Sequence, residues 1–212
     1  MPLDACFLCE PDSSLIYHED DTFFAMLGHG PIIEGYSLIA TKAHIPSMLD
    51  IDERAAEKIV LFAQQVRQRL RPYYGEVLLT EHGRVAPCEV DERSECKANC
   101  LHTREAHCYH AHRLVFPLHI DLDEALNKYG LALKHYSSFI ECYQKFTPKN
   151  EYLYWEKPDG TCTICSAPRQ LVRQFFRREI AETINNPDLA SWRKFPRLEV
   201  VEEAKSRLIE RK

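Results

Sequence analysis

The sequence of 212 residues lacks several features that mark common classes of protein. No stretch comes close to the roughly 18 uninterrupted apolar residues that indicate a membrane-spanning helix. Residues 1–20 have neither a basic segment nor a long apolar core, so we expect no secretion signal. We therefore expect a cytoplasmic location. Lysine and arginine total 27 against 32 acidic residues, and the net charge of −5 argues against nucleic-acid binding through overall positive charge.

Internal repeats and low-complexity tracts are also missing, which leaves the composition of an ordinary globular protein. Hydrophobic residues make up 45% of the chain and charged residues 28%. A chain of this length can bury a sizeable core, and it suits one domain with an extension or two small domains.

What the chain has in excess is cysteine, nine residues in all, most of them in groups. The odd number and the CxxC spacing favour metal binding in a reducing compartment over a disulfide framework. Cys142 stands alone in a helical stretch, where a small buried apolar residue is the expected role. The groups are Cys6 with Cys9, Cys162 with Cys165, and a cluster of Cys88, Cys96, Cys100 and Cys108 with His102 and His107.

Hydrophobic periodicity predicts the secondary structure. Alternation and β-forming residues indicate strands at 15–19, 23–27, 36–41, 76–80 and 152–156. Apolar residues at helical spacing indicate helices at 52–70, 170–184 and 198–210, with Pro72 ending the first, and a helical stretch at 122–146 interrupted near Gly130. The predicted fold class is α+β, with a mainly antiparallel sheet packed by a long helix and extended by a helical C-terminal segment.

The most informative segment is a strand with two histidines that closes on Pro117. Because successive side chains of a strand point to opposite faces, His110, His112 and Leu114 share one face. Imidazole is a nucleophile, a proton carrier and a metal ligand near neutral pH. Two imidazoles on a strand whose other residues suit burial therefore indicate a catalytic or metal-binding role.

Three residues far upstream suggest a metal site. Cys6 and Cys9 form a CxxC pair, and His44 follows the strand predicted at 36–41. With one histidine of the strand they would complete a tetrahedral Cys2His2 zinc site. Alternatively, the two cysteines pack as small apolar residues and His44 caps a turn.

The order of these motifs resembles the histidine triad (HIT) superfamily. Cys108-Tyr109-His110-Ala111-His112 and the run 174–181, followed by Trp192-Arg193, are similar to its CwfJ-like branch and bacterial relatives. This resemblance, which extends to the related galactose-phosphate uridylyltransferases, implies a HIT-like domain at 1–147 with a cysteine-rich insert at 84–107. Residues 148–212 would form a C-terminal extension packed on that core.

The resemblance also implies an activity: a HIT-type nucleotide hydrolase or nucleotidyltransferase acting on a phosphate ester, anhydride or phosphoramidate. Aligned on Pro117, His112 is the nucleophile that forms a covalent phospho-histidine intermediate. His110 is then a ligand of a structural zinc together with Cys6, Cys9 and His44. The implied partner is a small-molecule phosphate or nucleotide substrate, and HIT proteins commonly form homodimers.

Three departures from the HIT pattern bear on the substrate. The third triad position is Leu114, which cannot donate a hydrogen bond to phosphate. Gly28 stands three residues before Pro31, where an acidic residue typically binds ribose, and residues 105–107 replace small polar ones. These departures favour an unusual substrate or the alternative function, a noncatalytic CwfJ-like module that binds nucleic acid or protein and is stabilised by zinc.

Replacement phosphate donors could come from the predicted helix 170–184. Gln174 shares a helical face with Arg177 and Arg178, and guanidinium matches the paired oxygens of a phosphate. The alternative is that these arginines are solvated helix charges. His107 and His82 are further candidates for phosphate contact or proton transfer, or are ordinary histidines of a loop and a strand edge.

The cysteine-rich insert offers ligands for a second metal. Soft thiolates favour zinc, although the spacing matches no single zinc-finger pattern. A flexible loop acting as a lid is the alternative. Cys162 and Cys165 follow a turn as in a zinc knuckle, or join the ligands of the insert. The possible second-site ligands are Cys88, Cys96, Cys100 and His102.

Overall fold

The computed structural model describes residues 6–85, 110–148, 150–167, 171 and 174–210. Its centre is an eight-stranded sheet in which every neighbouring pair of strands is antiparallel. The strand order across the sheet is β1-β2-β3-β5-β4-β7-β8-β6. The predicted fold class, α+β with a mainly antiparallel sheet, is therefore confirmed.

The first half of the sheet agrees closely with the hydrophobic pattern of the sequence. Strands β1, β2 and β3 form an antiparallel meander, and β5 pairs with both β3 and β4. Strand β4 runs three residues beyond its predicted end, whereas β5 begins at the second histidine of the motif. The bounds are Ile16–Glu19 for β1, Phe23–Leu27 for β2, Ser37–Thr41 for β3, Leu78–Gly83 for β4 and His112–Phe116 for β5.

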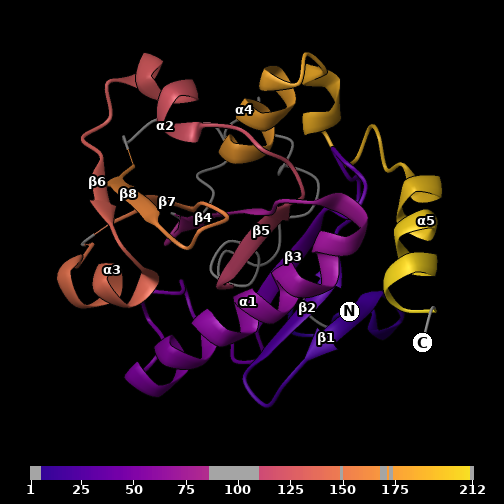
Figure 1. Cartoon of the computed structure of the whole chain (residues 1–212), viewed down its shortest axis with the longest axis horizontal. Helices are drawn as coiled ribbons and strands as arrows, with labels where there is room; N and C mark the ends of the chain where they lie inside the picture. Colours follow the sequence, from indigo (N-terminus) through magenta and orange to yellow (C-terminus); the bar gives the residue numbers. More distant parts are fainter. Residues whose placement is uncertain (1–5, 86–109, 149, 168–170, 172–173, 211–212) are drawn as a thin grey trace, which may run out of the picture.

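One face of the sheet is covered by α1, Glu53–Tyr74, which crosses in front of the strands in Figure 1. Asp52 caps its first turn by accepting a hydrogen bond from the amide of Ala55. Phe62 packs against Phe23 of β2, with 5.7 Å between ring centroids. The prediction that Pro72 ends this helix is wrong: the helix continues to Tyr74, and Gly75, with φ of +79°, ends it.

The second half of the sheet differs more from the prediction. The stretch 122–146 is not one interrupted helix, because an edge strand that pairs with β8 separates its two short helices. Strands β7 and β8, which follow residue 147, belong to the same sheet as β1–β5. The proposed domain division at 147 stays a prediction. The bounds are Leu122–Ala125 for α2, Lys134–Tyr136 for β6, Phe139–Lys145 for α3, Tyr152–Glu156 for β7 and Cys162–Ser166 for β8.

Two C-terminal helices, α4 at Phe175–Thr183 and α5 at Leu198–Leu208, pack on the rest of the molecule. Helix α4 contacts β4 and α5 contacts β2, and Figure 1 shows the C-terminus beside the β1–β2 side of the sheet. Short 3-10 turns complete the described chain: η1 at Ser13–Leu15, η3 at Asn127–Tyr129 and η4 at Pro187–Ala190. Within the described ranges, no helix combines the length and the apolar composition that a transmembrane span needs.

Candidate functional site

Four predicted metal ligands come together beside the start of β5. The Sγ atom of Cys6 lies 3.3 Å from Nδ1 of His110, and Sγ of Cys9 lies 3.1 Å from Nδ1 of His44 and 3.5 Å from Nδ1 of His110. The ligand atoms of all four residues lie within 4.8 Å of one another. This group could hold a metal ion.

Backbone contacts fix the histidines of this group. Cys9 donates its amide hydrogen to the carbonyl oxygen of Cys6, which closes the CxxC turn. Nε2 of His110 donates to the carbonyl oxygen of Thr41 at 2.7 Å, so the lone pair of Nδ1 faces the sulfur atoms. The amide of Ala111 donates to Ile45 at 2.7 Å, which ties the loop that carries His44 to the histidine strand. A hydrogen bond from the second ring nitrogen is the usual way in which proteins orient a ligating imidazole.

Burial and the neighbouring groups shift the pKa values of His110 and Cys9. Burial lowers the pKa of His110, which keeps its imidazole neutral and able to ligate. Burial also raises the pKa of the Cys9 thiol, and the adjacent Cys6 raises it further. A raised pKa favours the protonated thiol, and a divalent cation bound by the two sulfur atoms would offset the repulsion that raises it.

His112 is the first residue of β5, and its side chain is half-buried. Its Nδ1 lies 2.8 Å from the carbonyl oxygen of His110. Because a carbonyl oxygen only accepts hydrogen bonds, Nδ1 carries the proton and Nε2 keeps its lone pair. Burial lowers the pKa of His112 against the opposing effect of this hydrogen bond, and the charge of His82 lowers it further. The ring is therefore a neutral imidazole near pH 7.

The strand register defines the surroundings of His112. Phe24 pairs with Ala40 and Ala40 with His112, so these three side chains lie in one row on the face of the sheet opposite to α1. In the next row Leu114 lies between Leu38 and Thr80. The third triad position thus offers an apolar side chain flanked by one leucine and one threonine.

A hydroxyl and a third imidazole on β4 lie beside this row. The hydroxyl of Thr80 is buried and has no hydrogen-bond partner among the described residues. His82, two residues further on the same face, has its Nε2 3.4 Å from Oε2 of Glu151. The sequence offers His82 only as one candidate among several, because its nearness to His112 depends on the pairing of β4 with β5.

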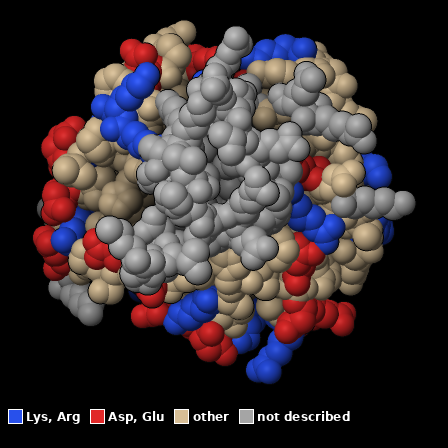
Figure 2. Space-filling model, turned by 180° about the vertical axis from the view of Figure 1, so that it is seen from behind, with Lys and Arg blue, Asp and Glu red and all other residues tan. Residues whose placement is uncertain are grey.

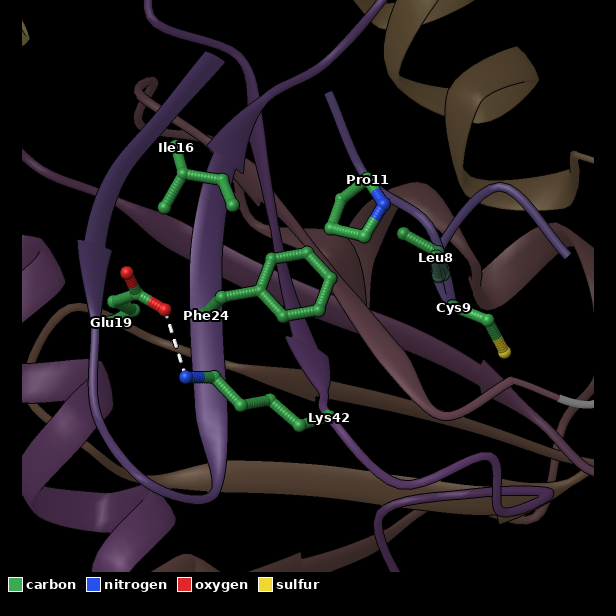
Figure 3. Close-up of a pocket in the computed structure, with 7 residues that line it drawn as sticks. All are labelled: Leu8, Cys9, Pro11, Ile16, Glu19, Phe24 and Lys42. Carbon is green, nitrogen blue, oxygen red and sulfur yellow. Dashed lines mark hydrogen bonds and ion pairs between the residues drawn. The ribbon is translucent and has the colours of Figure 1, made fainter. Parts of the chain in front are cut away.

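A pocket of about 280 Å³ lies on the same face, next to the CxxC turn. Figure 3 shows the ring of Phe24 between Ile16 and Pro11, with the ammonium of Lys42 paired to Glu19 at 2.8 Å. Phe24 and His112 lie in the same row two strands apart. The pocket is lined by Leu8, Cys9, Pro11, Ile16, Glu19, Phe24 and Lys42.

The opposite face of β5 carries a buried charge network under α1. The guanidinium of Arg113, fully buried, lies 3.1 Å from Oε2 of Glu156 and 3.9 Å from Oε2 of Glu81. Burial raises the pKa of Glu81, whereas for Glu156 the effect of burial is outweighed by Arg67 and Arg113, so its pKa is lowered. Glu81 also accepts a hydrogen bond from the amide of Met48, which supports the loop after His44.

The loop that precedes Pro31 explains why Gly28 is glycine. A Cβ atom at Gly28 would lie 2.3 Å from the ring of Tyr36, so no larger residue fits without a shift of that ring. The acidic residue expected at this position in a HIT protein therefore cannot be accommodated by the packing seen here.

The C-terminal residues predicted to bind phosphate are placed against this same loop. Arg177 is buried and donates to the carbonyl oxygens of Gly30, Leu189 and Ala190 at 2.7–3.1 Å. In the amide orientation that satisfies both of its polar atoms, the side-chain nitrogen of Gln174 donates to the carbonyl oxygen of Ala190, and its oxygen accepts from the indole nitrogen of Trp192. These contacts give Arg177 and Gln174 a structural role; Arg178 is exposed, and phosphate binding by the three stays a prediction.

The remaining predicted site residues lie outside the described residues. They are His107, Cys88, Cys96, Cys100 and His102, so the second metal site also stays a prediction. Figure 2 shows the molecule from the side opposite to the view of Figure 1, and the acidic and basic side chains of the described residues are interspersed around its rim.

Comparison with known proteins finds similarity only at the level of solved structures. No family model matches the sequence, and no curated protein matches it. A hypothetical histidine triad nucleotide-binding protein from Sulfolobus tokodaii is 20% identical, with a TM-score of 0.38, over 53% of this chain and 68% of that one. A HIT family hydrolase from Clostridium thermocellum is 20% identical, with a TM-score of 0.36, over 57% of this chain and 95% of that one.

A third neighbour aligns with more of the chain. Yeast Ap4A phosphorylase in complex with AMP is 12% identical, with a TM-score of 0.43, over 89% of this chain and 79% of that one. At such identities and TM-scores, these likenesses do not establish the family to which the chain belongs.

Proposed function

We propose that the protein is an enzyme of the HIT type that hydrolyses or transfers a nucleotidyl group through a covalent intermediate on His112. Nε2 of His112 attacks phosphorus, and the bond to the leaving group breaks as the phosphorus–nitrogen bond forms. Water or another acceptor then displaces the histidine. Two such steps each have a lower barrier than the direct displacement.

The observation that carries this proposal is the hydrogen bond from Nδ1 of His112 to the carbonyl oxygen of His110, at 2.8 Å. It sets the tautomer in which Nε2 is unprotonated, and the lowered pKa keeps the ring in this nucleophilic form. A histidine kept only for packing would not need a fixed tautomer on the face that also bears His82.

We further propose that the metal is zinc, held by Cys6, Cys9, His44 and His110. In a tetrahedral site with Zn–S distances of about 2.3 Å and Zn–N distances of about 2.0 Å, ligand atoms lie roughly 3.3–3.8 Å apart. The sulfur–nitrogen distances of 3.1, 3.3 and 3.5 Å are close to this range. With four protein ligands the ion has no open position, so it would link the CxxC turn to the strand that carries His112.

The test is steady-state and burst kinetics with adenosine 5′-phosphoramidate and a dinucleoside polyphosphate. The wild-type protein is expected to release AMP from at least one of them, and His112→Gln to lose about 10³-fold or more of kcat, as loss of a catalytic nucleophile does. His119→Gln is the matched control, because His119 is 81% exposed and paired with Glu76 at the far end of β5. Turnover that survives in His112→Gln would contradict the proposal.

The second candidate function is the noncatalytic binding module. The tight packing of Gly28 against Tyr36 favours it, because the place of the ribose-binding acid is closed to larger residues. This alternative predicts RNA or protein binding that is unchanged in His112→Gln, together with no turnover of either nucleotide by the wild-type protein.

A further inference from the structure

The strand β4 brings His82 to the face of the sheet that carries His112. The pairing of β4 with β5 ends at Thr80 and Leu114, and continuing this antiparallel register by two residues on each strand would bring His82 opposite His112. Residues two apart on a strand share a face. The effect of the charge of His82 on the pKa of His112 agrees with this proximity.

Glu151 orients the imidazole of His82. The distance from Nε2 of His82 to Oε2 of Glu151 is 3.4 Å, and both side chains are partly buried, with 14% and 23% of their surface exposed. Because a carboxylate accepts the hydrogen bond, Nε2 carries the proton that points to Glu151. Nδ1 of His82 is then the nitrogen that can meet a ligand.

The residues on either side of His82 hold the end of β4 in place. The carboxylate of Glu81 points to the opposite face and accepts hydrogen bonds from the amide of Met48 at 2.8 Å and the hydroxyl of Tyr152 at 2.6 Å. A Cβ atom at Gly83 would lie 2.1 Å from the ring of Tyr152, so the strand packs directly on that ring. The position of His82 is therefore set by a rigid strand, as a catalytic group requires.

Leu114, at the third position of the motif on β5, supplies no proton donor to the proposed reaction. An amine or alkoxide leaving group must gain a proton as its bond to phosphorus breaks, and leucine cannot supply one. The neighbouring strand β4 carries an imidazole, that of His82, which the register brings beside His112.

We propose that His82 is a second catalytic histidine, which protonates the leaving group and then accepts a proton from the attacking water. This inference rests on the proposed function of His112. It adds the proton transfers to that reaction, which matter most for phosphoramidates and alkyl esters, because their leaving groups need a proton.

The proton and the electrons balance over the two steps. In the first, Nε2 of His112 forms a bond to phosphorus, the bond from phosphorus to the leaving oxygen or nitrogen breaks, and the imidazolium of His82 gives its Nδ1 proton to the leaving atom. In the second, neutral His82 takes a proton from water while the water oxygen bonds to phosphorus and the phosphorus–Nε2 bond breaks. Both histidines return to their starting forms.

The test compares two AMP derivatives at one pH, the alkyl phosphoramidate and the p-nitrophenyl ester. The p-nitrophenolate anion leaves without a proton, so its release does not depend on a general acid. We expect His82→Gln to lower the rate of intermediate formation from the phosphoramidate by about 10²–10⁴-fold, the usual contribution of general acid–base catalysis. The loss with the p-nitrophenyl ester is expected to be less than about tenfold, and His119→Gln is expected to leave both rates unchanged.

Each outcome separates the two proposals. Equal losses on both substrates, or no loss on the phosphoramidate, would overturn the role of His82 while leaving His112 as the nucleophile. A wild-type protein that turns over neither substrate would contradict the proposed function, and the role of His82 with it. If His82→Gln does not fold, as judged by its melting temperature, His82→Asn serves in the same comparison, because it also lacks the transferable proton.

Discussion

Replacement of His44 by glutamine is expected to destabilise the protein as much as removal of the metal does. The side chain of His44 is exposed, so its own packing contributes little and its main contribution would be ligation of the proposed zinc. An ion present at about 1,000 times its Kd stabilises the folded state by about 4 kcal/mol. In a chain of this length each kcal/mol shifts Tm by about 2–4 °C, so the expected decrease is about 8–16 °C.

The assay is thermal unfolding followed by circular dichroism, with and without a chelator, together with metal content by mass spectrometry. The wild-type protein should contain about one metal ion per chain and lose stability with the chelator, whereas His44→Gln should start at the lower Tm and change little further. His119→Gln should behave as the wild type. A purified wild-type protein without bound metal, whose Tm the chelator leaves unchanged, would refute the reasoning.

Three further predictions concern the packing around the site. Gly28→Ala should cost about 1–3 kcal/mol, because the added Cβ atom meets the ring of Tyr36, and a Tm equal to that of the wild type would contradict this. Arg113→Met should cost about 3–5 kcal/mol in chemical denaturation, because it leaves the buried carboxylate of Glu81 without its cation and that of Glu156 with Arg67 alone. For Glu156, burial raises the pKa but Arg67 and Arg113 outweigh it, so the pKa is lowered in the folded state. Its ionisation therefore stabilises the fold above the ordinary pKa of a glutamate, and this stabilisation is lost as the pH falls through the lowered pKa. Glu156→Gln should flatten the acid limb of the stability curve.

Much of the sheet could be predicted from the sequence because its strands are marked by local pattern. Strands β2 and β7 lie where alternation and β-forming residues indicate them. The edge strand β6 could not be predicted in this way, because three residues carry too little periodicity and their conformation depends on pairing with β8. Pro72 is tolerated near the end of α1 rather than ending it, which a local rule also misses.

The candidate site could also be predicted from the sequence only in part. The grouping of Cys6, Cys9 and His44 with a histidine of the strand could be predicted from residue types that commonly share a metal, and the resemblance selected His110. The structure brings these four residues together, and their role as metal ligands stays a prediction. The burial of Arg177 against three carbonyl oxygens could not be predicted, because an arginine on a predicted helix is equally compatible with a solvated charge and with an anion ligand. The place of His82 beside His112 depends on which strands pair, and spacing along the chain carries no information about that.

The most direct test of the central claim is to trap the reaction of the wild-type protein with an AMP phosphoramidate and to map the product by tandem mass spectrometry. The account predicts an adenylyl group on Nε2 of His112, absent from His112→Gln and retained longer in His82→Gln. An adenylyl group on another residue, or product release with no modified histidine during turnover, would contradict it.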